Sequence, residues 1–145
     1  MSAADRADAV YEALLSRAGE RWVQPRKERT ARILAFLDDP QRTDRVVHST
    51  GTNGKTSTAR MIDSLLRAHD LRTGLFTSPH LERFTERIMI DGEPISDAAV
   101  ADAWDEIEPF VGIVDAELEA AGDAPLTFFE LLTVLAFLAA ADAPV

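Results

Sequence analysis

The stretch of the sequence best suited to chemistry is a loop that begins with a glycine and contains a second glycine followed by a lysine and two hydroxyl residues. It reads Gly51, Thr52, Asn53, Gly54, Lys55, Thr56 and Ser57. Glycines permit positive φ angles, so successive backbone N–H groups can turn inward and cradle a phosphate. The lysine can reach the β- and γ-phosphates of a nucleotide, and a following hydroxyl can meet Mg²⁺. We therefore expect these seven residues to bind ATP, with Lys55 as the catalytic residue.

The loop meets the short pattern G-x-x-G-K-[ST], which arises by chance in about 1% or fewer of chains of this length. It does not meet the strict pattern G-x-x-x-x-G-K-[ST], because Ser49 occupies the first glycine position. The alternative interpretation is a glycine turn with a solvated lysine. The predicted strand before the loop and helix after it favour the phosphate-binding interpretation.

A strand and a helix must position such a loop. The β-branched run from Arg45 to Thr50 predicts a strand, and a helix is expected from about Thr56 to Ala68. A second strand over Arg72 to Thr77 would complete a βαβ unit, which requires parallel strands and a right-handed crossover. The sequence therefore predicts an α/β fold with a P-loop-type parallel sheet and flanking helices.

Helices are expected on both sides of this unit. Amphipathic patterns predict one over residues 4–18 and another that starts after Pro25 and runs to Leu37. The alternating segment from Glu86 to Asp91 predicts a further strand, which ends in an Asp91-Gly92 turn.

Two helices are expected near the end of the sequence. Ser96 can cap a helix to about Glu108, where Pro109 should interrupt it before a further helical stretch to Ala121. Thr127 begins the last helix.

The composition excludes several classes of protein. The 145 residues are 46% hydrophobic, which suits one soluble domain, and the absence of cysteine excludes disulfides, thiolate metal sites and a cysteine nucleophile. A net charge of -10 argues against a broad nucleic-acid-binding surface. The start lacks the pattern of a signal peptide, and the apolar run from Leu131 to Ala141 is too short to span a membrane. We expect a cytoplasmic protein with no nucleic-acid or membrane partner.

Three stretches resemble the folylpolyglutamate synthase/dihydrofolate synthase family, within the Mur ligases. The stretch V-V-H-S-T-G-T-N-G-K-T-S-T resembles its phosphate loop. The stretch G-L-F-T-S-P-H-L-E-R-F-T-E-R-I-M-I-D-G-E-P-I-S resembles its long loop and following strand, and L-T-F-F-E-L-L-T resembles its folate-side helix start. The resemblance covers nearly all of residues 20–145.

The resemblance implies ATP-dependent amide formation that uses Mg²⁺. ATP would phosphorylate a carboxylate of folate or dihydropteroate, and the amine of L-glutamate would then attack the acyl phosphate. It also implies that Ser78 ligates Mg²⁺, and a hydroxyl is a suitable hard-oxygen ligand for that ion. From the residues alone, Ser78-Pro79 is typical of a turn.

Three further side chains, those of His80, Arg83 and Arg87, are possible phosphate or carboxylate contacts. Imidazole suits Mg²⁺ poorly, so we interpret His80 as a residue that orders the loop rather than as a metal ligand. The alternative for the two arginines is surface pairing with Glu82 or Glu86.

The stretch Thr127-Phe128-Phe129-Glu130 has two compatible interpretations. It fits a capping box, in which the threonine hydroxyl and the glutamate carboxylate satisfy N–H groups at a helix start. The resemblance implies in addition that it lines a pterin pocket, where one phenylalanine could stack on the flat ring. At least one of the two phenylalanines is expected in the core.

The resemblance also predicts the domain organisation. Residues 1–44 would be a helical lead-in and residues 45–145 the P-loop α/β region, together an incomplete Mur ligase central ATPase domain without the C-terminal domain. We expect this chain alone to be inactive and the full-length ligase to be a monomer. The motifs do not distinguish addition of the first glutamate from addition of later ones.

Alternative functions are a non-catalytic nucleotide-binding module and another Mur-family amide ligase. A peptidoglycan-precursor ligase would carry a sizeable domain before the phosphate loop, whereas about fifty residues precede Gly51 here. An unrelated P-loop ATPase would lack the T-S-P-H loop.

Overall fold

The structure is a computed structural model that describes residues 1–17, 26–143 and 145. Helices make up most of it. The α-helices are α1 (Ala3–Leu15), α2 (Lys27–Phe36), α3 (Lys55–Ala68), α4 (Asp97–Ala120) and α5 (Phe128–Asp142). The strands are β1 (Gly74–Phe76), β2 (Ile88–Ile90) and β3 (Glu93–Pro94), and the 3₁₀ turns are η1 (Pro40–Arg42) and η2 (Phe84–Arg87). Residue 18, the last residue expected in the first helix, lies outside the described residues. The second helix begins after Pro25, as expected, with Lys27 as its first residue.

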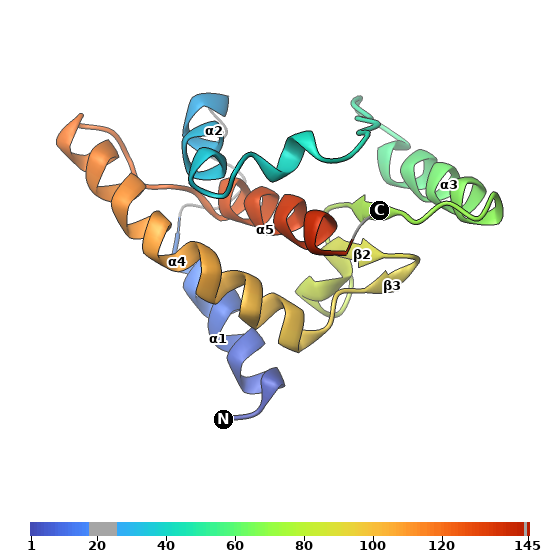
Figure 1. The fold of residues 1–145 in the computed structure, drawn as a ribbon, viewed down its shortest axis with the longest axis horizontal. Coiled ribbons are helices and arrows are strands. Elements are labelled where there is room, and N and C mark those ends of the chain that lie inside the picture. Colours follow the sequence, from blue (N-terminus) through green and yellow to red (C-terminus); the bar gives the residue numbers. More distant parts are fainter. Residues whose placement is uncertain (18–25, 144) are drawn as a thin grey trace.

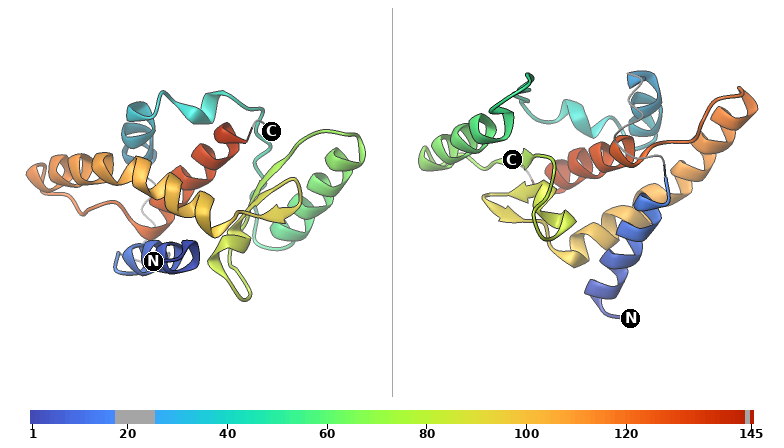
Figure 2. Two further views of the ribbon diagram at one scale, coloured as in Figure 1. Left: turned by 60° about the horizontal axis from the view of Figure 1, so that its bottom comes forward. Right: turned by 180° about the vertical axis from the view of Figure 1, so that it is seen from behind.

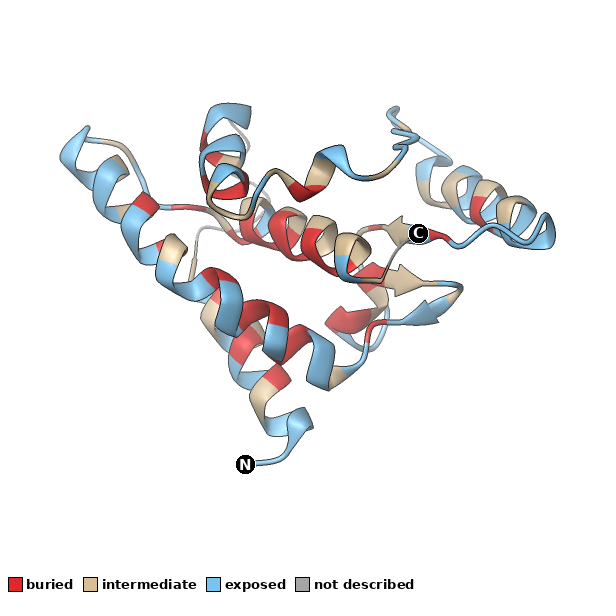
Figure 3. Ribbon diagram, in the orientation of Figure 1, coloured by how far each residue is buried: buried red, intermediate tan, exposed pale blue. Residues whose placement is uncertain are grey.

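The hydrophobic core lies where α1, α2, α4 and α5 meet (Figure 1). Helix α5 is the most apolar of them, and Figure 3 shows buried positions along most of its length. Fully buried side chains from all four helices are Leu14, Ile33, Ile107, Val114, Leu131, Leu132 and Leu135. Because α1 and α2 pack on α4 and α5, residues 1–17 and 26–44 share this core.

Local capping determines where α4 and α5 begin, as the sequence predicts. The Ser96 hydroxyl accepts a hydrogen bond from the Ala99 backbone N–H at 3.1 Å. Thr127 and Glu130 form a reciprocal capping box at the start of α5. The backbone of Gly122 has a φ of 73° just past the end of α4, a conformation that glycine adopts without a Cβ penalty.

The expected interruption of a helix at Pro109 is wrong. Helix α4 continues from Asp97 to Ala120 with Pro109 inside it. Pro109 is exposed, whereas Ile107 and Val111 on either side of it are buried. Packing of both halves of the helix on one core therefore outweighs the hydrogen bond that the proline cannot donate.

The sheet has the order β1-β2-β3 and is antiparallel throughout. Gly74 lies opposite Ile90, and Phe76 lies opposite Ile88. The chain turns from β2 to β3 at Asp91-Gly92, where both residues have positive φ angles (51° and 83°). The turn predicted at this dipeptide is confirmed.

The predicted parallel pairing is not observed. Residues 45–50 form no strand, and Val46 and Val47 are exposed. A β-branched run becomes a strand only when a neighbouring strand satisfies its backbone, and among the described residues β1 pairs with β2 instead. Helix α3 contacts β1 but lies away from α1 and α4, as the views in Figures 1 and 2 agree.

Candidate functional site

The glycine loop lies directly before α3. Gly54 is the residue before the helix, with a φ of 73°, and Lys55 is the first helical residue. Gly51 also has a positive φ, 147°, so both glycines adopt conformations that L side chains rarely take. The five residues from Gly51 to Lys55 are exposed, as is Ser57, whereas Thr56 is half-buried.

The first turn of α3 has the features that favour binding of an anion. No side chain caps this helix start, and its first turn contains no acidic residue. Backbone N–H groups at a helix start and the positive end of the helix dipole favour negative charge. The Lys55 ammonium donates a hydrogen bond to the Gly51 carbonyl, which places its charge against the loop. The loop therefore fits a phosphate group.

The loop that carries Ser78 follows β1, the strand that comes after α3 in the chain. The backbone N–H of Thr77, the buried residue before Ser78, donates to the Arg87 carbonyl at 2.9 Å. Ser78 is half-buried, and the peptide bond between Ser78 and Pro79 is cis. The Ser78 hydroxyl thus comes from a loop whose start is held by the sheet.

Glu86 holds the other end of this loop. Its carboxylate accepts backbone N–H groups from Leu81 at 2.9 Å, Glu82 at 3.1 Å and Arg83 at 2.9 Å. The hydrogen bond from Arg83, followed by that from Leu81, lowers the pKa of the Glu86 carboxyl below its ordinary value, although burial opposes the shift. Glu86 is therefore engaged with backbone rather than with an arginine.

The two arginines near the loop differ in their surroundings. Arg83 is exposed and pairs with Asp97 at 2.7 Å, not with Glu82 or Glu86. Arg87 is only 6% exposed, and its Nε donates to His80 Nδ1 at 2.8 Å. Its guanidinium also lies over the Phe128 ring, 5.2 Å from the centroid. Arg87 therefore contacts the protein interior, and His80 is bonded within the loop.

The phenylalanines of the T-F-F-E stretch divide between core and surface. Phe128 is 5% exposed, which confirms the expectation that at least one of the pair is in the core. Phe129 is 41% exposed and stacks on Phe76 of β1, with ring centroids 5.7 Å apart. Phe129 is thus the ring that another flat molecule could reach.

Thr127 and Glu130 act first as a helix cap. The Thr127 N–H donates to Glu130 Oε2 at 2.8 Å, and the Glu130 N–H donates to Thr127 Oγ1 at 3.3 Å. Glu130 also lies 3.7 Å from Arg29. Arg29 was not among the predicted site residues. The signal in the sequence that could have found it is the Glu28-Arg29 dipeptide.

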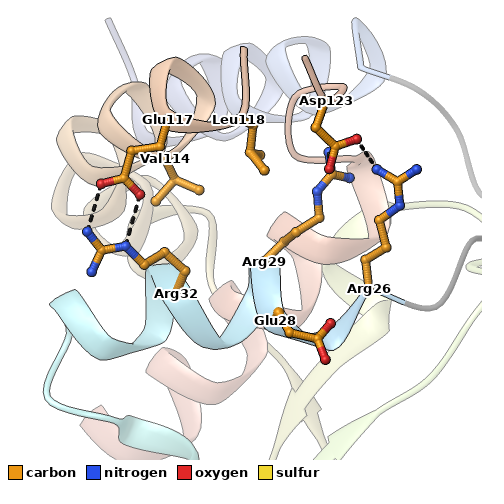
Figure 4. Close-up of a pocket in the computed structure, with 8 residues that line it drawn as sticks. All are labelled: Arg26, Glu28, Arg29, Arg32, Val114, Glu117, Leu118 and Asp123. Carbon is orange, nitrogen blue, oxygen red and sulfur yellow. Dashed lines mark hydrogen bonds and ion pairs between the residues drawn. The ribbon is translucent and has the colours of Figure 1, made fainter. Parts of the chain in front are cut away.

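Arg29 is held in a pocket between α2 and α4 (Figure 4). Its side chain is 7% exposed and lies 3.4 Å from Asp123, which also bonds Arg26. The hydrogen bond from Arg26 is the main cause of a lowered pKa at Asp123. Among the described residues, Arg29 Nε has no hydrogen-bond partner, and Nη2 has only its ion pair with Asp123.

The structure thus brings some of the proposed residues together and leaves others apart. Phe129 meets Phe76 at β1, and Arg87 meets Phe128, so the Ser78 loop and the T-F-F-E stretch lie side by side. Within the described residues, no hydrogen bond or ion pair joins the glycine loop to either of them. Tyr11 of α1, the single tyrosine of the chain, packs on Phe84 and Phe128 here and was not expected.

Neither a protein-built metal cluster nor a membrane span is found in the part of the chain that the structure describes. No three His, Asp or Glu side chains there gather closely enough to hold an ion. None of the described helices is both long and apolar enough to cross a bilayer.

No protein-family model matches the chain. Comparison with individual proteins is more informative. The dihydrofolate synthase/folylpolyglutamate synthase of Mycobacterium tuberculosis is 45% identical over 133 residues, which are 87% of this chain and 27% of that protein. The folylpolyglutamate synthase of Lacticaseibacillus casei is 45% identical over 109 residues, 72% of this chain and 24% of its own length.

Solved structures agree with the sequence relatives. The Mycobacterium tuberculosis folylpolyglutamate synthase complexed with ADP superposes with a TM-score of 0.91 at 42% identity, covering 99% of this chain and 31% of that chain. A folylpolyglutamate synthase complex with AMPPCP and folate gives a TM-score of 0.80 at 33% identity, covering 99% and 33%.

The shared fold first defines a class: the chain has an α/β fold consistent with that of Mur-type ligases. Within that class, the sequence identities are more specific. The chain belongs to the folylpolyglutamate synthase/dihydrofolate synthase family. It spans about a quarter to a third of the length of these relatives.

Proposed function

We propose that the chain supplies the nucleotide-binding part of an ATP-dependent ligase that adds L-glutamate to the carboxylate of folate or dihydropteroate. The observation that carries the proposal is the glycine loop at the uncapped start of α3, with Lys55 as its first helical residue. An acyl phosphate intermediate needs a nucleotide phosphate placed against a carboxylate. The relatives named above include proteins solved with ADP, with AMPPCP and with folate.

Each proposed residue has a role that its position supports. Residues 51–57 would donate N–H and hydroxyl groups to the ATP phosphates, with Lys55 neutralising charge that develops on the γ-phosphate. Ser78 would add one oxygen ligand to a Mg²⁺ ion that is otherwise coordinated by phosphate and water. Bound Mg²⁺ would polarise the phosphoryl group that is transferred.

The folate side is proposed at the T-F-F-E stretch. Phe129 is exposed and already stacked on Phe76, so its ring can extend that stack to a pterin. Thr127 and Glu130 would shape the side of the pterin site by capping α5. His80 and Arg83 lie on the neighbouring loop, where Arg83 could exchange its exposed pairing with Asp97 for a substrate carboxylate.

We also propose the wider setting of this segment. In a ligase of the relatives' length, residues 45–50 would become a strand of a parallel sheet, and the exposed Val46 and Val47 side chains support this. Residues 1–44 and 45–145 would then be a helical lead-in and the P-loop region of the central domain, followed by a C-terminal domain. A cytoplasmic monomer acting only on small molecules fits the absence of cysteine and the net charge of -10.

Nucleotide binding can be tested with the chain's two lysines, Lys27 and Lys55. We expect Mg²⁺·AMPPCP to shift the backbone amide NMR signals of residues 51–57 in the 145-residue protein. Lys55→Ala should weaken binding by roughly 10- to 100-fold, the effect of losing one charge-assisted hydrogen bond. Lys27→Ala removes the same charge from the exposed start of α2 and should leave binding unchanged. Equal binding by both variants would contradict the role of Lys55.

Ligase activity requires a separate measurement on a protein of the relatives' length that contains this chain. We expect ADP formation to depend on both glutamate and a folate substrate, tested with dihydropteroate and with tetrahydrofolate. ADP formed at the same rate without either substrate would favour a simple nucleotide hydrolase. Nucleotide binding without any turnover would favour a non-catalytic module.

A further inference from the structure

His80 is held from both sides, by Arg87 seven positions later in the chain and by Tyr11 69 positions earlier. Arg87 Nε donates to His80 Nδ1 at 2.8 Å, and Tyr11 Oη lies 3.4 Å from His80 Nε2. The Tyr11 ring is itself fixed, stacked on Phe84 at a centroid distance of 4.9 Å with an interplanar angle of 5°. We call Tyr11, His80 and Arg87 the His80 clamp.

The chemistry of the clamp determines where the imidazole proton lies. A guanidinium has only N–H donors, so His80 Nδ1 must accept the hydrogen bond from Arg87 and carry no proton. The ring proton of a neutral imidazole is then on Nε2, where the Tyr11 hydroxyl oxygen can accept it. The direction of both hydrogen bonds therefore follows from Arg87 alone.

The clamp joins three elements at the loop that carries Ser78. Tyr11 belongs to α1, Arg87 to η2, and His80 lies two residues after Ser78. Arg87 is 6% exposed and stacks over Phe128, so it offers a rigid donor rather than a mobile surface charge. A loop residue that is bonded at both ring nitrogens cannot rotate without breaking one of the two contacts.

We propose that Arg87 locks His80 in its Nε2-protonated tautomer. Arg87 and Tyr11 would then be positioning residues that together hold the His80 ring and thereby orient the Ser78 loop. The orientation of the loop matters for catalysis only through the proposed function, on which this part of the inference rests. The tautomer and the order of the loop are properties of the chain itself. They can be measured without nucleotide or substrate.

The first test is the NMR signature of the imidazole nitrogens in the 145-residue protein. In long-range ¹H–¹⁵N spectra at about pH 8.5, above the ordinary titration range of histidine, we expect unprotonated Nδ1 and protonated Nε2 at His80. His48 and His69 are exposed and serve as references within the same molecule. A protonated Nδ1 at His80, or a tautomer mixture equal to that of His48 and His69, would overturn the proposal.

The second test separates the two contacts with amide isosteres of histidine. The Asn side-chain oxygen lies near the Nδ1 position and can accept from Arg87, whereas the Gln side-chain nitrogen lies near Nε2 and can reach only Tyr11. We expect His80→Ala to speed amide hydrogen exchange at Leu81, Glu82 and Arg83 by roughly 2- to 10-fold, the effect of one lost hydrogen bond. His80→Asn should restore most of the protection and His80→Gln much less.

Tyr11→Phe provides the matched control, because it keeps the ring stack on Phe84 and removes only the hydroxyl. We expect the Nε2-protonated tautomer to persist in this variant, with a smaller rise in loop exchange than in His80→Ala. Wild-type exchange rates in His80→Ala, or equal rates in the Asn and Gln variants, would refute the clamp. Failure of AMPPCP to bind a protein with the expected tautomer would refute the proposed function and leave the clamp intact.

Discussion

Glu86 organises the Ser78 loop at the scale of a single residue. One carboxylate accepts the three consecutive backbone N–H groups of residues 81–83, an arrangement that stabilises its charged form. Those N–H groups would otherwise depend on water, because this part of the loop is exposed. The loop is therefore sensitive to the ionisation state of one side chain.

This arrangement predicts a pH dependence. The pKa of Glu86 is lowered in the folded protein, chiefly by the hydrogen bond from Arg83. The stabilisation of the turn should therefore be complete above the ordinary glutamate pKa of about 4.3 and be lost as the pH falls through the lower folded value. The pH titration of the amide signals of residues 81–83 measures this. Glu86→Gln should remove the transition, whereas the transition should persist in Glu82→Gln.

The adjacent pair Phe128 and Phe129 should differ sharply in its contribution to stability. Phe128→Ala empties a buried position and should lower the free energy of unfolding by about 3–5 kcal/mol. Phe129→Ala removes a ring that is 41% exposed and should cost less than about 2 kcal/mol. Urea unfolding of the two variants decides the matter, and equal losses would contradict the division into core and surface.

At the scale of elements, α4 contains residues that favour other conformations yet remains one helix. Pro109 and Gly112 lie within it, and the buried residues before and after them keep both halves on the core. Its stability therefore comes from packing more than from intrinsic helix propensity. Replacing an exposed glycine within α4 by a better helix former should therefore increase the stability of the protein.

Gly112 inside α4 and Gly122 just past its end form a matched pair for this test. A Cβ added at either Gly112 or Gly122 would meet no other atom within 4 Å. Gly112 is helical, so Gly112→Ala should raise the free energy of unfolding by about 0.5–1 kcal/mol. Gly122 has a φ of 73°, so Gly122→Ala should lower it by about 1 kcal/mol. Thermal unfolding midpoints should move in opposite directions, and a common direction would count against this account.

At the scale of the whole molecule, the packing is uneven. The core is concentrated in α1, α2, α4 and α5, whereas Asp63 is the one buried residue among those of α3. The helix that carries the glycine loop thus contributes little to the core. Substitutions in α3 should separate nucleotide binding from folding.

Leu65 and Leu132 test this uneven packing. Leu65 of α3 is exposed, and Leu65→Gln should change the free energy of unfolding by no more than about 0.5 kcal/mol. Leu132 of α5 is fully buried, and Leu132→Ala should lower it by about 2–5 kcal/mol. Guanidinium unfolding curves provide the measurement. A loss above about 1 kcal/mol in Leu65→Gln would show that α3 packs more tightly than the structure indicates.

The features that the sequence by itself determined are those set by residues within a few positions of one another. The helix caps at Ser96 and Thr127 and the Asp91-Gly92 turn belong to this group, because their hydrogen bonds and φ angles involve neighbouring residues. The conformation of the glycine loop before α3 also follows from its local glycines. The roles of Lys55, Ser78 and the T-F-F-E stretch remain predictions that rest on motif and resemblance.

Only the tertiary structure decided the remaining features. Local pattern favoured a strand over residues 45–50 and an interruption at Pro109, but strand pairing and core contacts come from distant segments. The same holds for the contact of Tyr11 with His80, 69 positions later in the chain, and for that of Arg29 with Glu130. Burial and strand pairing depend on which distant segments come into contact, and a pattern of neighbouring residues does not specify those tertiary contacts.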